Sequence, residues 1–195
     1  MKLKSFFRSS GYLADSFIKS DSGKELDLKD LPDFLRTLLV TDGTVTKSLE
    51  AWFWEPVIVK VSRNECVALS KSLDGLEANF GDKVLQREVS LCGKKTERVF
   101  STAQSTIALQ FLPEDVSESL EKGSIGIGEI LRDKGLETYR DIFQLNYLPN
   151  YQPTHSLSDE LCGEIISRSY RIWVNERPAI IVNEFFSINF YNESE

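Results

Sequence analysis

The sequence predicts an α+β fold in which a single domain carries a roughly six-stranded antiparallel sheet with helices packed on it. Hydrophobic residues alternate in several runs, such as 84–91 and 168–174, as they do in strands with one buried face. Turn residues, for example those at 92–95, separate neighbouring runs by hairpin lengths. Helical patterns gather in the first half and the middle of the chain, which favours an antiparallel sheet over a βαβ repeat.

Length, composition and charge narrow the classes of function. The chain has 195 residues, which suits one domain with residues 1–30 set apart as an N-terminal extension. Its formal net charge of −7 argues against general affinity for nucleic acid or anionic membranes, since both need a basic surface. No apolar run approaches the roughly 20 residues that span a bilayer, and residues 1–17 lack the apolar block of a signal peptide. We therefore expect a cytoplasmic protein with no nucleic-acid or membrane partner.

The cysteine and histidine content disfavours a metal site. The three cysteines, Cys66, Cys92 and Cys162, are isolated and odd in number, so we expect buried, reduced thiols rather than a disulfide framework. The single histidine, His155, lies in a loop rich in proline and serine, where we expect an exposed side chain rather than a member of a catalytic triad. We expect neither a metal nor another cofactor.

The first half of the predicted fold is organised around a change of period. A helix that starts near 31–33 ends at Thr41-Asp42-Gly43, because aspartate and glycine there favour a turn. Alternating side chains over 47–53 then predict a strand, and the alternating valines at 57–61 predict another. The local prediction is a helix that leads into a long, bent antiparallel ribbon.

The other elements follow the same two periodicities. Residues 84–91 and 97–107 are predicted to form one hairpin, and 168–174 and 179–190 a second hairpin around a turn at 175–178. The remaining predictions, in chain order, are a short amphipathic helix with Phe6, Phe7, Tyr12, Leu13 and Phe17, a helix that opens at 112–115, a short helix at 129–131, a strand at 138–145 and a loop at 147–157.

Glycines are concentrated at Gly123-Ser124-Ile125-Gly126-Ile127-Gly128, directly before the predicted short helix. Free backbone N–H groups at such a turn bind anions, so an anion contact is one interpretation. The spacing G-x-x-G-x-G differs from both the G-x-G-x-x-G and the GxxxxGK[ST] nucleotide motifs, and no βαβ pattern surrounds it. A nucleotide site is therefore disfavoured, whereas a carboxylate-binding turn and a purely structural turn both stay open.

A single acidic residue interrupts the apolar run at 180–186. Glu184 must be paired, protonated or directed into a cavity, since burying a lone carboxylate costs on the order of several kcal/mol. A functional carboxylate and a structural ion pair are both compatible with this position.

Arg87 has a similar setting between Leu85 and Val89 on a predicted strand. Its guanidinium fork could hold a substrate carboxylate or pair with an acid such as Glu184. Arg168 and Arg171 could provide the same contact from another strand. These residues are the candidates for a binding site for a small anionic molecule.

Four segments in these regions resemble the chorismate pyruvate-lyase family. Residues 38–47 (LLVTDGTVTK) resemble the family's LL…D-S-M-T-K segment beside the active site, and 86–89 (QREV) resemble its L-R-E-I strand. Gly126-Ile127-Gly128 resembles its P-L-G turn, and 177–184 (RPAIIVNE) resembles its K-P-L-L-L-T-E strand. The four segments occur in the family's order, and the likeness extends from about residue 31 to the C-terminus.

The resemblance implies a chorismate lyase-like fold and a cofactor-free lyase that converts chorismate to 4-hydroxybenzoate and pyruvate. On the family's pattern, Arg87 would hold the ring carboxylate and Glu184 would meet the ring hydroxyl, as the two catalytic residues. Further substrate-binding residues on this pattern would be Val45, Thr46 and Lys47 in a flap and Ile127 and Gly128 at the glycine turn.

The sequence departs from the ubiquinone-pathway enzymes of the family in one strand. Their G-R-T arginine is absent, because Ala103-Gln104-Ser105-Thr106 stands in its place. Chorismate carries two carboxylates, so a second cation is needed, and Lys47 or Arg171 could supply it. The divergent branch seen in cyanobacteria and plastids fits better, which implies a product used for plastoquinone and, for a plastid gene, a location in the stroma.

The alternative is a non-catalytic module that binds an aromatic carboxylate. The same fold resembles the effector-binding domain of bacterial transcription regulators. Residues 1–30 are too short for the winged helix that such a regulator needs, and the net charge is negative. The sequence therefore favours the enzyme, and it does not define an oligomeric state.

Overall fold

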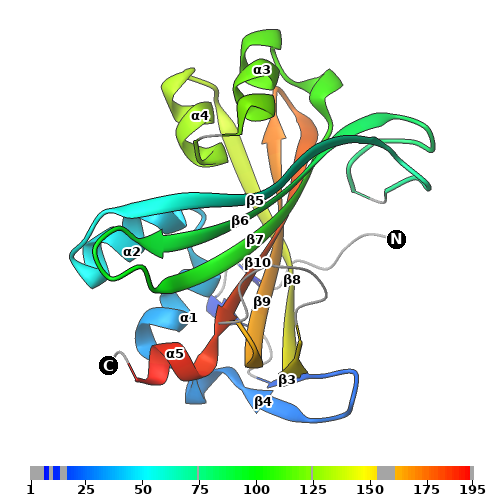
Figure 1. Cartoon of the computed structure of the whole chain (residues 1–195). Coiled ribbons are helices and arrows are strands. Elements are labelled where there is room, and N and C mark those ends of the chain that lie inside the picture. The colour runs from blue at the N-terminus through cyan, green and yellow to red at the C-terminus, as the bar shows by residue number, and fades with distance from the viewer. Residues whose placement is uncertain are drawn as a thin grey trace.

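A six-stranded antiparallel sheet forms the centre of the molecule (Figure 1). The structure is a computed structural model, which describes residues 17–73, 75–123, 125–152 and 161–193, and the backbone of the short strands β1 (Phe7–Arg8) and β2 (Gly11–Leu13). The spatial order β5-β6-β7-β10-β9-β8 consists of antiparallel neighbours throughout, which confirms the predicted fold class. The strands are β5 (Val57–Ala68), β6 (Lys83–Gly93), β7 (Val99–Ile107), β8 (Thr138–Tyr151), β9 (Gly163–Val174) and β10 (Arg177–Ser187).

Two groups of helices lie at opposite ends of the sheet (Figure 1). The first group is α1 (Asp33–Val40), α2 (Val45–Phe53) and α5 (Ile188–Asn192), and the second is α3 (Glu114–Lys122) and α4 (Ile127–Asp133). The smaller described elements are β3 (Phe17–Lys19), β4 (Glu25–Asp27), η1 (Leu28–Asp30) and η2 (Leu109–Phe111).

Each helix group buries its own apolar cluster against the same face of the sheet. Phe186 of β10 belongs to the cluster under α1, α2 and α5, whereas Ile180 and Val182 belong to the cluster under α3 and α4. Side chains two residues apart leave a strand on the same face, so these positions place both clusters on one side of β10. The stretch of sheet between the two clusters faces a cavity.

The strand predicted at 47–53 is wrong, because these residues belong to helix α2. Val45 and Leu49 are buried and Phe53 is partly buried in the same cluster, so the apolar stripe has the i, i+4, i+8 spacing of a helix. Alternate positions suggested a strand because Leu49 and Phe53 also satisfy a period of two. Ala51, which lies between them, is exposed, so the alternation does not mark a buried face.

The predicted N-terminal helix is also wrong. Its residues Phe7, Tyr12, Leu13 and Phe17 fall in the short strands β1, β2 and β3 instead, while Phe6 lies outside the described residues. Strand β1 pairs with β2, and β3 pairs with β4, so these segments form small hairpins. Aromatic residues fit both patterns, which made the period of this short segment ambiguous.

Strand β8 is longer than the predicted strand at 138–145. It continues to Tyr151, which pairs with Gly163 of β9, so the loop predicted at 147–157 begins later than expected. Strand β8 lies at the edge of the sheet, and an edge strand tolerates Pro149 because one side of its backbone needs no ladder partner.

The three cysteines all lie in described parts of the chain and form no disulfide, and only one of them is buried. Cys92 lies inside the fold, whereas Cys66 and Cys162 are exposed, which corrects the expectation of three buried thiols. The Cys66 thiol donates to a Glu121 carboxylate oxygen at 3.2 Å. Burial, together with this contact, raises the pKa of the Cys66 thiol.

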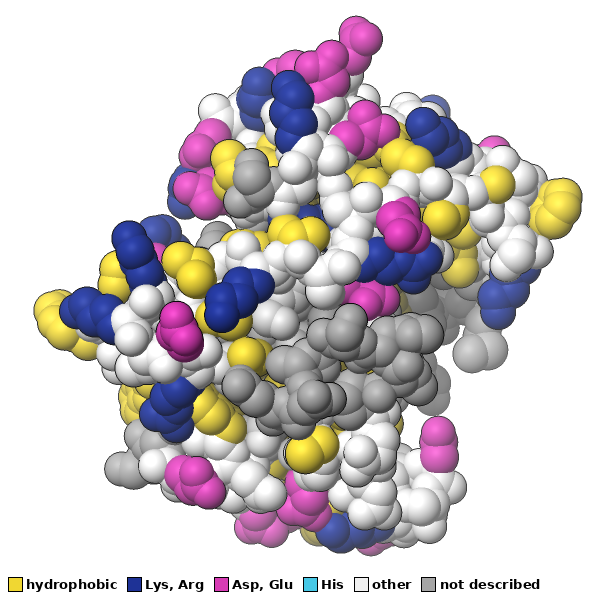
Figure 2. Space-filling model, in the orientation of Figure 1, with side chains coloured by type: hydrophobic (Ala, Val, Ile, Leu, Met, Phe, Trp, Pro, Cys, Tyr) yellow, Lys and Arg dark blue, Asp and Glu magenta, His cyan; other side chains and the backbone are white. Residues whose placement is uncertain are grey.

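Charged side chains of both signs are interspersed over the described part of the face in Figure 2. An extended basic field, which nucleic acid would require, is not seen there. Among the described residues, no helix is long and apolar enough to cross a membrane.

Candidate functional site

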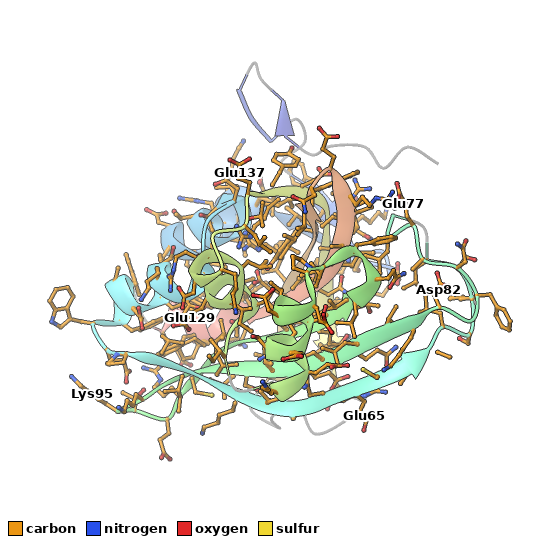
Figure 3. All side chains as sticks on the ribbon, turned by 90° about the horizontal axis from the view of Figure 1, so that it is seen from above. Glu65, Glu77, Asp82, Lys95, Glu129 and Glu137 are labelled. Atoms are coloured by element: carbon orange, nitrogen blue, oxygen red, sulfur yellow. The ribbon has the colours of Figure 1, made fainter. Side chains whose placement is uncertain are left out.

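A cavity of about 230 Å³ lies between the two helix groups. Its floor is the sheet, and its walls are the first turns of α2 and α4 with the loops before them. This volume is below the roughly 300–1,000 Å³ typical of drug-sized ligands, so the cavity suits a small molecule such as a substituted ring. In the view from above, α3 and α4 lie over the strands, and the cavity-lining Glu129 is labelled on α4 (Figure 3).

Small side chains on β7 keep the cavity floor open. Ala103 and Ser105 face the cavity, with Glu184 of β10 beside Ala103 and Arg87 of β6 beside Ser105. Adjacent strands lie about 4.8 Å apart, so the backbones of Arg87 and Glu184 are separated by about 10 Å across the sheet and about 7 Å along it. Their long side chains therefore approach the same space from two sides.

Arg87 is a buried cation without an acidic partner. Its side chain is 2% exposed, and among the described residues no carboxylate forms an ion pair with it. Its Nη2 donates to the carbonyl oxygens of Gly123 at 3.1 Å and Ile125 at 2.6 Å, while its buried Nε has no hydrogen-bond partner. Burial lowers the pKa of Arg87, because removal from water disfavours the charged form. An anionic ligand would supply the missing counter-charge.

Glu184 has a protein partner at each carboxylate oxygen. Arg168 Nε donates to Oε2 at 2.6 Å, and the Tyr170 hydroxyl donates to Oε1 at 3.0 Å. Burial and the Glu184 charge raise the pKa of Tyr170, so this hydroxyl stays protonated and acts as a donor. Glu184 also lines the cavity. The structural ion pair and the cavity-facing carboxylate considered from sequence are therefore both present.

Arg168 connects the sheet to the end of α1. Its Nη1 donates to the carbonyl oxygens of Leu38 and of Thr41, the latter at 2.8 Å. The Leu38 carbonyl belongs to the last turn of α1 and Thr41 is its C-cap, so both acceptors lie where a helix leaves carbonyls without intrahelical partners. The same guanidinium thus fixes Glu184 and the segment that leads into the α2 wall.

The α2 wall contains the predicted residues Val45, Thr46 and Lys47. Lys47 forms an ion pair with Glu50 at 2.8 Å, and the other oxygen of Glu50 accepts the Val57 N–H at 3.2 Å. The Lys47 contact holds the pKa of Glu50 below its ordinary value. The charge of Lys47 is therefore already partnered within the chain.

The α4 wall contains the predicted residues Ile127 and Gly128. A Cβ atom on Gly128 would lie 3.4 Å from Nη2 of Arg140, so the glycine allows a close approach of this guanidinium. Arg87 supports the same wall, because both carbonyls that it binds belong to the loop before α4.

Arg171 is not brought into the cavity with the other predicted residues. It lies between Tyr170 and Ile172, which both line the cavity, so its side chain leaves β9 on the opposite face. There it forms an ion pair with Asp141 of β8.

Sequence reasoning did not single out Ala103, Arg140 and Tyr170 as site residues. All three line the cavity. Arg140 precedes the buried Ile142 by two residues, and Tyr170 follows Arg168 by two, so strand alternation would have placed them on the buried face. A small residue such as Ala103 gives no such signal.

The described residues contain no group of three or more histidine, cysteine, aspartate or glutamate side chains arranged to hold a metal ion. His155 lies outside the described residues, so its predicted exposure is not addressed by the structure.

Solved structures of other proteins share this fold. PhnF from Mycobacterium smegmatis is similar with a TM-score of 0.57 at 13% identity, covering 77% of this chain and 66% of that chain. The effector domain of the same protein gives 0.56 at 13% identity, with 75% and 90% covered. Gene product SA0254 from Staphylococcus aureus gives 0.55 at 18% identity, with 77% and 91% covered. The chain thus belongs to the α+β fold class that these structures share.

Sequence comparison defines the family within that class. The model described as "Chorismate pyruvate-lyase Rv2949c-like" matches residues 39–193. The chorismate pyruvate-lyase of Mycobacterium leprae is 28% identical over 170 residues, which cover 86% of this chain and 80% of that protein. That of Mycobacterium tuberculosis (strain CDC 1551 / Oshkosh) is 25% identical over 174 residues, with 86% of each covered. The chain belongs to the Rv2949c-like chorismate pyruvate-lyase family, which confirms the resemblance seen in its motifs.

Proposed function

We propose that this protein converts chorismate to 4-hydroxybenzoate and pyruvate. The observation that carries the proposal is that Arg87 and Glu184 line one small cavity from two sides. Membership of a chorismate pyruvate-lyase family supports the class of reaction.

The polar groups of chorismate match this arrangement. Its ring carboxylate and its 4-hydroxyl lie at opposite ends of the ring. Arg87 has no acidic partner in the described part of the chain and would bind the carboxylate by a charge-assisted hydrogen bond. Glu184 would accept a hydrogen bond from the hydroxyl, and the small side chains of Ala103 and Ser105 leave room for the ring.

The proposed reaction is an elimination that is balanced in atoms and electrons. The C4–H bond and the bond from C3 to the ether oxygen break, and the ring becomes aromatic. The enolpyruvyl fragment leaves as the enolate of pyruvate, and its methylene carbon receives the proton that C4 loses. That transfer occurs within the substrate or through the Glu184 carboxylate. No redox partner is required by this balance.

The protein's contribution would be orientation and exclusion of water. Arg168 and Tyr170 fix the Glu184 carboxylate before substrate arrives, so little reorganisation is needed on binding. The walls formed by the starts of α2 and α4 would enclose the enolpyruvyl group and keep water from the reacting atoms.

The test is to follow formation of 4-hydroxybenzoate by chromatography for the wild type, Arg87→Met and Glu184→Gln. Arg63→Met is the matched control, because Arg63 forms a surface ion pair with Glu65 on β5, outside the cavity lining. We expect turnover well above the spontaneous rate in the wild type and the control. Loss of one charge-assisted contact to the ligand should lower kcat/KM by about tenfold or more in Arg87→Met. Full turnover in Arg87→Met would contradict the assigned site.

The alternative function is that of a non-catalytic module that binds aromatic carboxylates. The likeness in fold to an effector domain is the observation that favours it. The same samples distinguish it. A wild type that is stabilised by 4-hydroxybenzoate but forms no product would be a binding module, and the lyase proposal would then be wrong.

The destination of the product is also a proposal that rests on resemblance. Free 4-hydroxybenzoate is a ring that a quinone pathway, such as that of plastoquinone, can prenylate. We propose a cytoplasmic enzyme, or a stromal one for a plastid gene, whose direct partners are chorismate and 4-hydroxybenzoate.

A further inference from the structure

Four cationic side chains line the cavity, namely Lys47, Arg87, Arg132 and Arg140. Lys47 is paired with Glu50, and Arg132 is paired with Glu129 and Asp133. Within the described part of the chain, Arg87 and Arg140 form no ion pair with a carboxylate. The cavity therefore offers two unneutralised cations, and Arg87 accounts for one anionic group of a ligand.

Arg140 lies on the opposite side of the cavity from Arg87. It belongs to the edge strand β8, and β9, β10 and β7 separate it from β6, which carries Arg87. Its Nη1 donates to the Asp42 carbonyl at 3.2 Å, so the guanidinium lies beneath the loop that precedes α2. The absent Cβ of Gly128 leaves room for its Nη2 beside α4. Arg140 is thus held where both walls meet, with donors left over.

Arg140 is also electrostatically coupled to the Glu184 side of the cavity. Burial and the Glu184 carboxylate raise the pKa of Tyr170, and the charges of Arg168 and Arg140 act in the opposite direction. The Arg140 guanidinium is therefore close enough to influence the hydroxyl that binds Glu184.

We propose that Arg140 binds the second carboxylate of the substrate, the one on the enolpyruvyl side chain. This inference rests on the proposed function and adds a specificity residue to it. The enolpyruvyl ether is attached at C3, beside the hydroxyl-bearing C4. A ring held between Arg87 and Glu184 therefore directs this group away from β6, toward the β9 and β8 side. Among the described residues, Arg140 is the cavity-lining cation on that side that has no carboxylate partner. Arg171, which the sequence also suggested, leaves the sheet on the other face.

The product provides a sharp test, because 4-hydroxybenzoate keeps the ring carboxylate and has lost the second one. Arg140→Met should weaken the binding of chorismate but not of 4-hydroxybenzoate, whereas Arg87→Met should weaken the binding of both. Arg63→Met is the matched control, since this arginine forms a surface ion pair with Glu65 and lies outside the cavity lining. The measurements are kcat/KM for chorismate and the Kd of 4-hydroxybenzoate by calorimetry.

We expect Arg140→Met to lower kcat/KM for chorismate about tenfold or more, because one charge-assisted contact to the substrate is lost. The Kd of 4-hydroxybenzoate should change by less than about twofold. Arg140→Lys should recover part of the loss, since it restores the charge without the fork. An unchanged kcat/KM in Arg140→Met, or an equal loss of 4-hydroxybenzoate affinity, would overturn the assignment. If the wild type forms no product, the lyase proposal fails instead, and the Kd of chorismate in the same variants then tests Arg140 separately.

Discussion

The Glu184 carboxylate has one partner at each oxygen, and both partners are themselves buried. Breaking such a group of contacts costs more than its net contribution suggests, because a charge remains without compensation. The interactions that stabilise Glu184 also fix its direction relative to the cavity. Stability and orientation at this residue are therefore determined by the same hydrogen bonds.

Tyr170→Phe should separate these two effects. The change removes the donor to Glu184 Oε1, and an unsatisfied buried acceptor costs about 1–3 kcal/mol. We expect that loss in the free energy of unfolding, measured with urea. We also expect kcat for chorismate to fall with little change in KM, because Glu184 would lose its orientation while the proposed contact of Arg87 with the ring carboxylate would remain.

Tyr191→Phe is the matched control for this positioning role. Tyr191 is also a buried tyrosine, but it does not line the cavity, and its hydroxyl donates to the Phe100 carbonyl at 3.0 Å rather than to Glu184. We expect a comparable loss of stability without the loss of kcat. Equal kcat in both variants would show that Tyr170 has only a structural role.

At the scale of elements, the tip of the β6–β7 hairpin is bound by a carboxylate from the turn between α2 and β5. Glu55 accepts hydrogen bonds from the Lys95 N–H at 2.8 Å, the Thr96 N–H at 3.1 Å and the Thr96 hydroxyl at 2.8 Å. A Cβ atom on Gly93 would lie 2.6 Å from the Glu55 carboxylate, so a larger residue here would displace that carboxylate. Lys95 marks the tip of this hairpin in Figure 3, at the opposite end of the ribbon from Glu77 and Asp82.

Glu55 should make the stability of the protein depend on pH. Burial raises the pKa of Glu55, but the hydrogen bonds from Thr96 and Lys95 outweigh burial and hold it below its ordinary value of 4.5. A lowered pKa in the folded state means that the contribution is fully present above about pH 4.5 and is lost as the pH falls through the folded-state pKa. Glu55→Gln should therefore melt below the wild type at pH 7, and the difference should shrink toward pH 3.

The control for Glu55→Gln is Glu65→Gln, which changes an exposed carboxylate on the neighbouring strand β5. Melting temperatures at pH 7, 5 and 3 give the comparison. A difference between wild type and Glu55→Gln that stays constant over this range would show that the charge of Glu55 does not stabilise the hairpin.

The elements differ in how well local sequence predicts them. Strands β9 and β10 have long alternating runs and a tight turn at Asn175 and Glu176, which both adopt positive φ, so the hairpin could be predicted. Its bounds were less well predicted, because the turn has two residues rather than four and residues 188–190 of the predicted strand belong to α5. Helix α2 has only nine residues, and its apolar residues satisfy periods of two and of four equally well. Packing against α1 and α5, which is not visible in local sequence, decides between these two patterns.

The site residues likewise differ in whether local sequence or tertiary structure reveals them. Arg87 and Glu184 could be predicted because a charge within an apolar strand needs a partner or a cavity. Alternation along β8 could place Arg140 on the buried face, but only the register brings β8, and Ala103 of β7, beside the strands that carry the other residues. Which sheet face Arg171 occupies also depends on register, because a shift of one residue reverses the face of every side chain.

On the scale of the whole molecule, the cavity exists because two separate apolar clusters pack on one sheet face and leave a gap between them. Arg87 supports the wall beside the second cluster, and Arg168 supports the end of α1 beside the first. A ligand that bridges Arg87 and Glu184 would therefore contact both halves. Ligand binding should stabilise the entire fold rather than one loop.

Saturation with 4-hydroxybenzoate should consequently raise the melting temperature. A ligand at one hundred times its Kd adds about 2.7 kcal/mol to the free energy of unfolding, which corresponds to roughly 5–10 °C for a chain of this size.

Ala103→Leu should abolish the shift, because the larger side chain would occupy the space above the floor between Arg87 and Glu184. Thr102→Val is the control, since this neighbour faces the other side of β7 and its buried hydroxyl has no hydrogen-bond partner among the described residues. The control should keep the full shift, measured by calorimetry. An equal shift in Ala103→Leu would mean that the ligand binds elsewhere. With leucine in the cavity, the ring could no longer fit between the two halves and connect them.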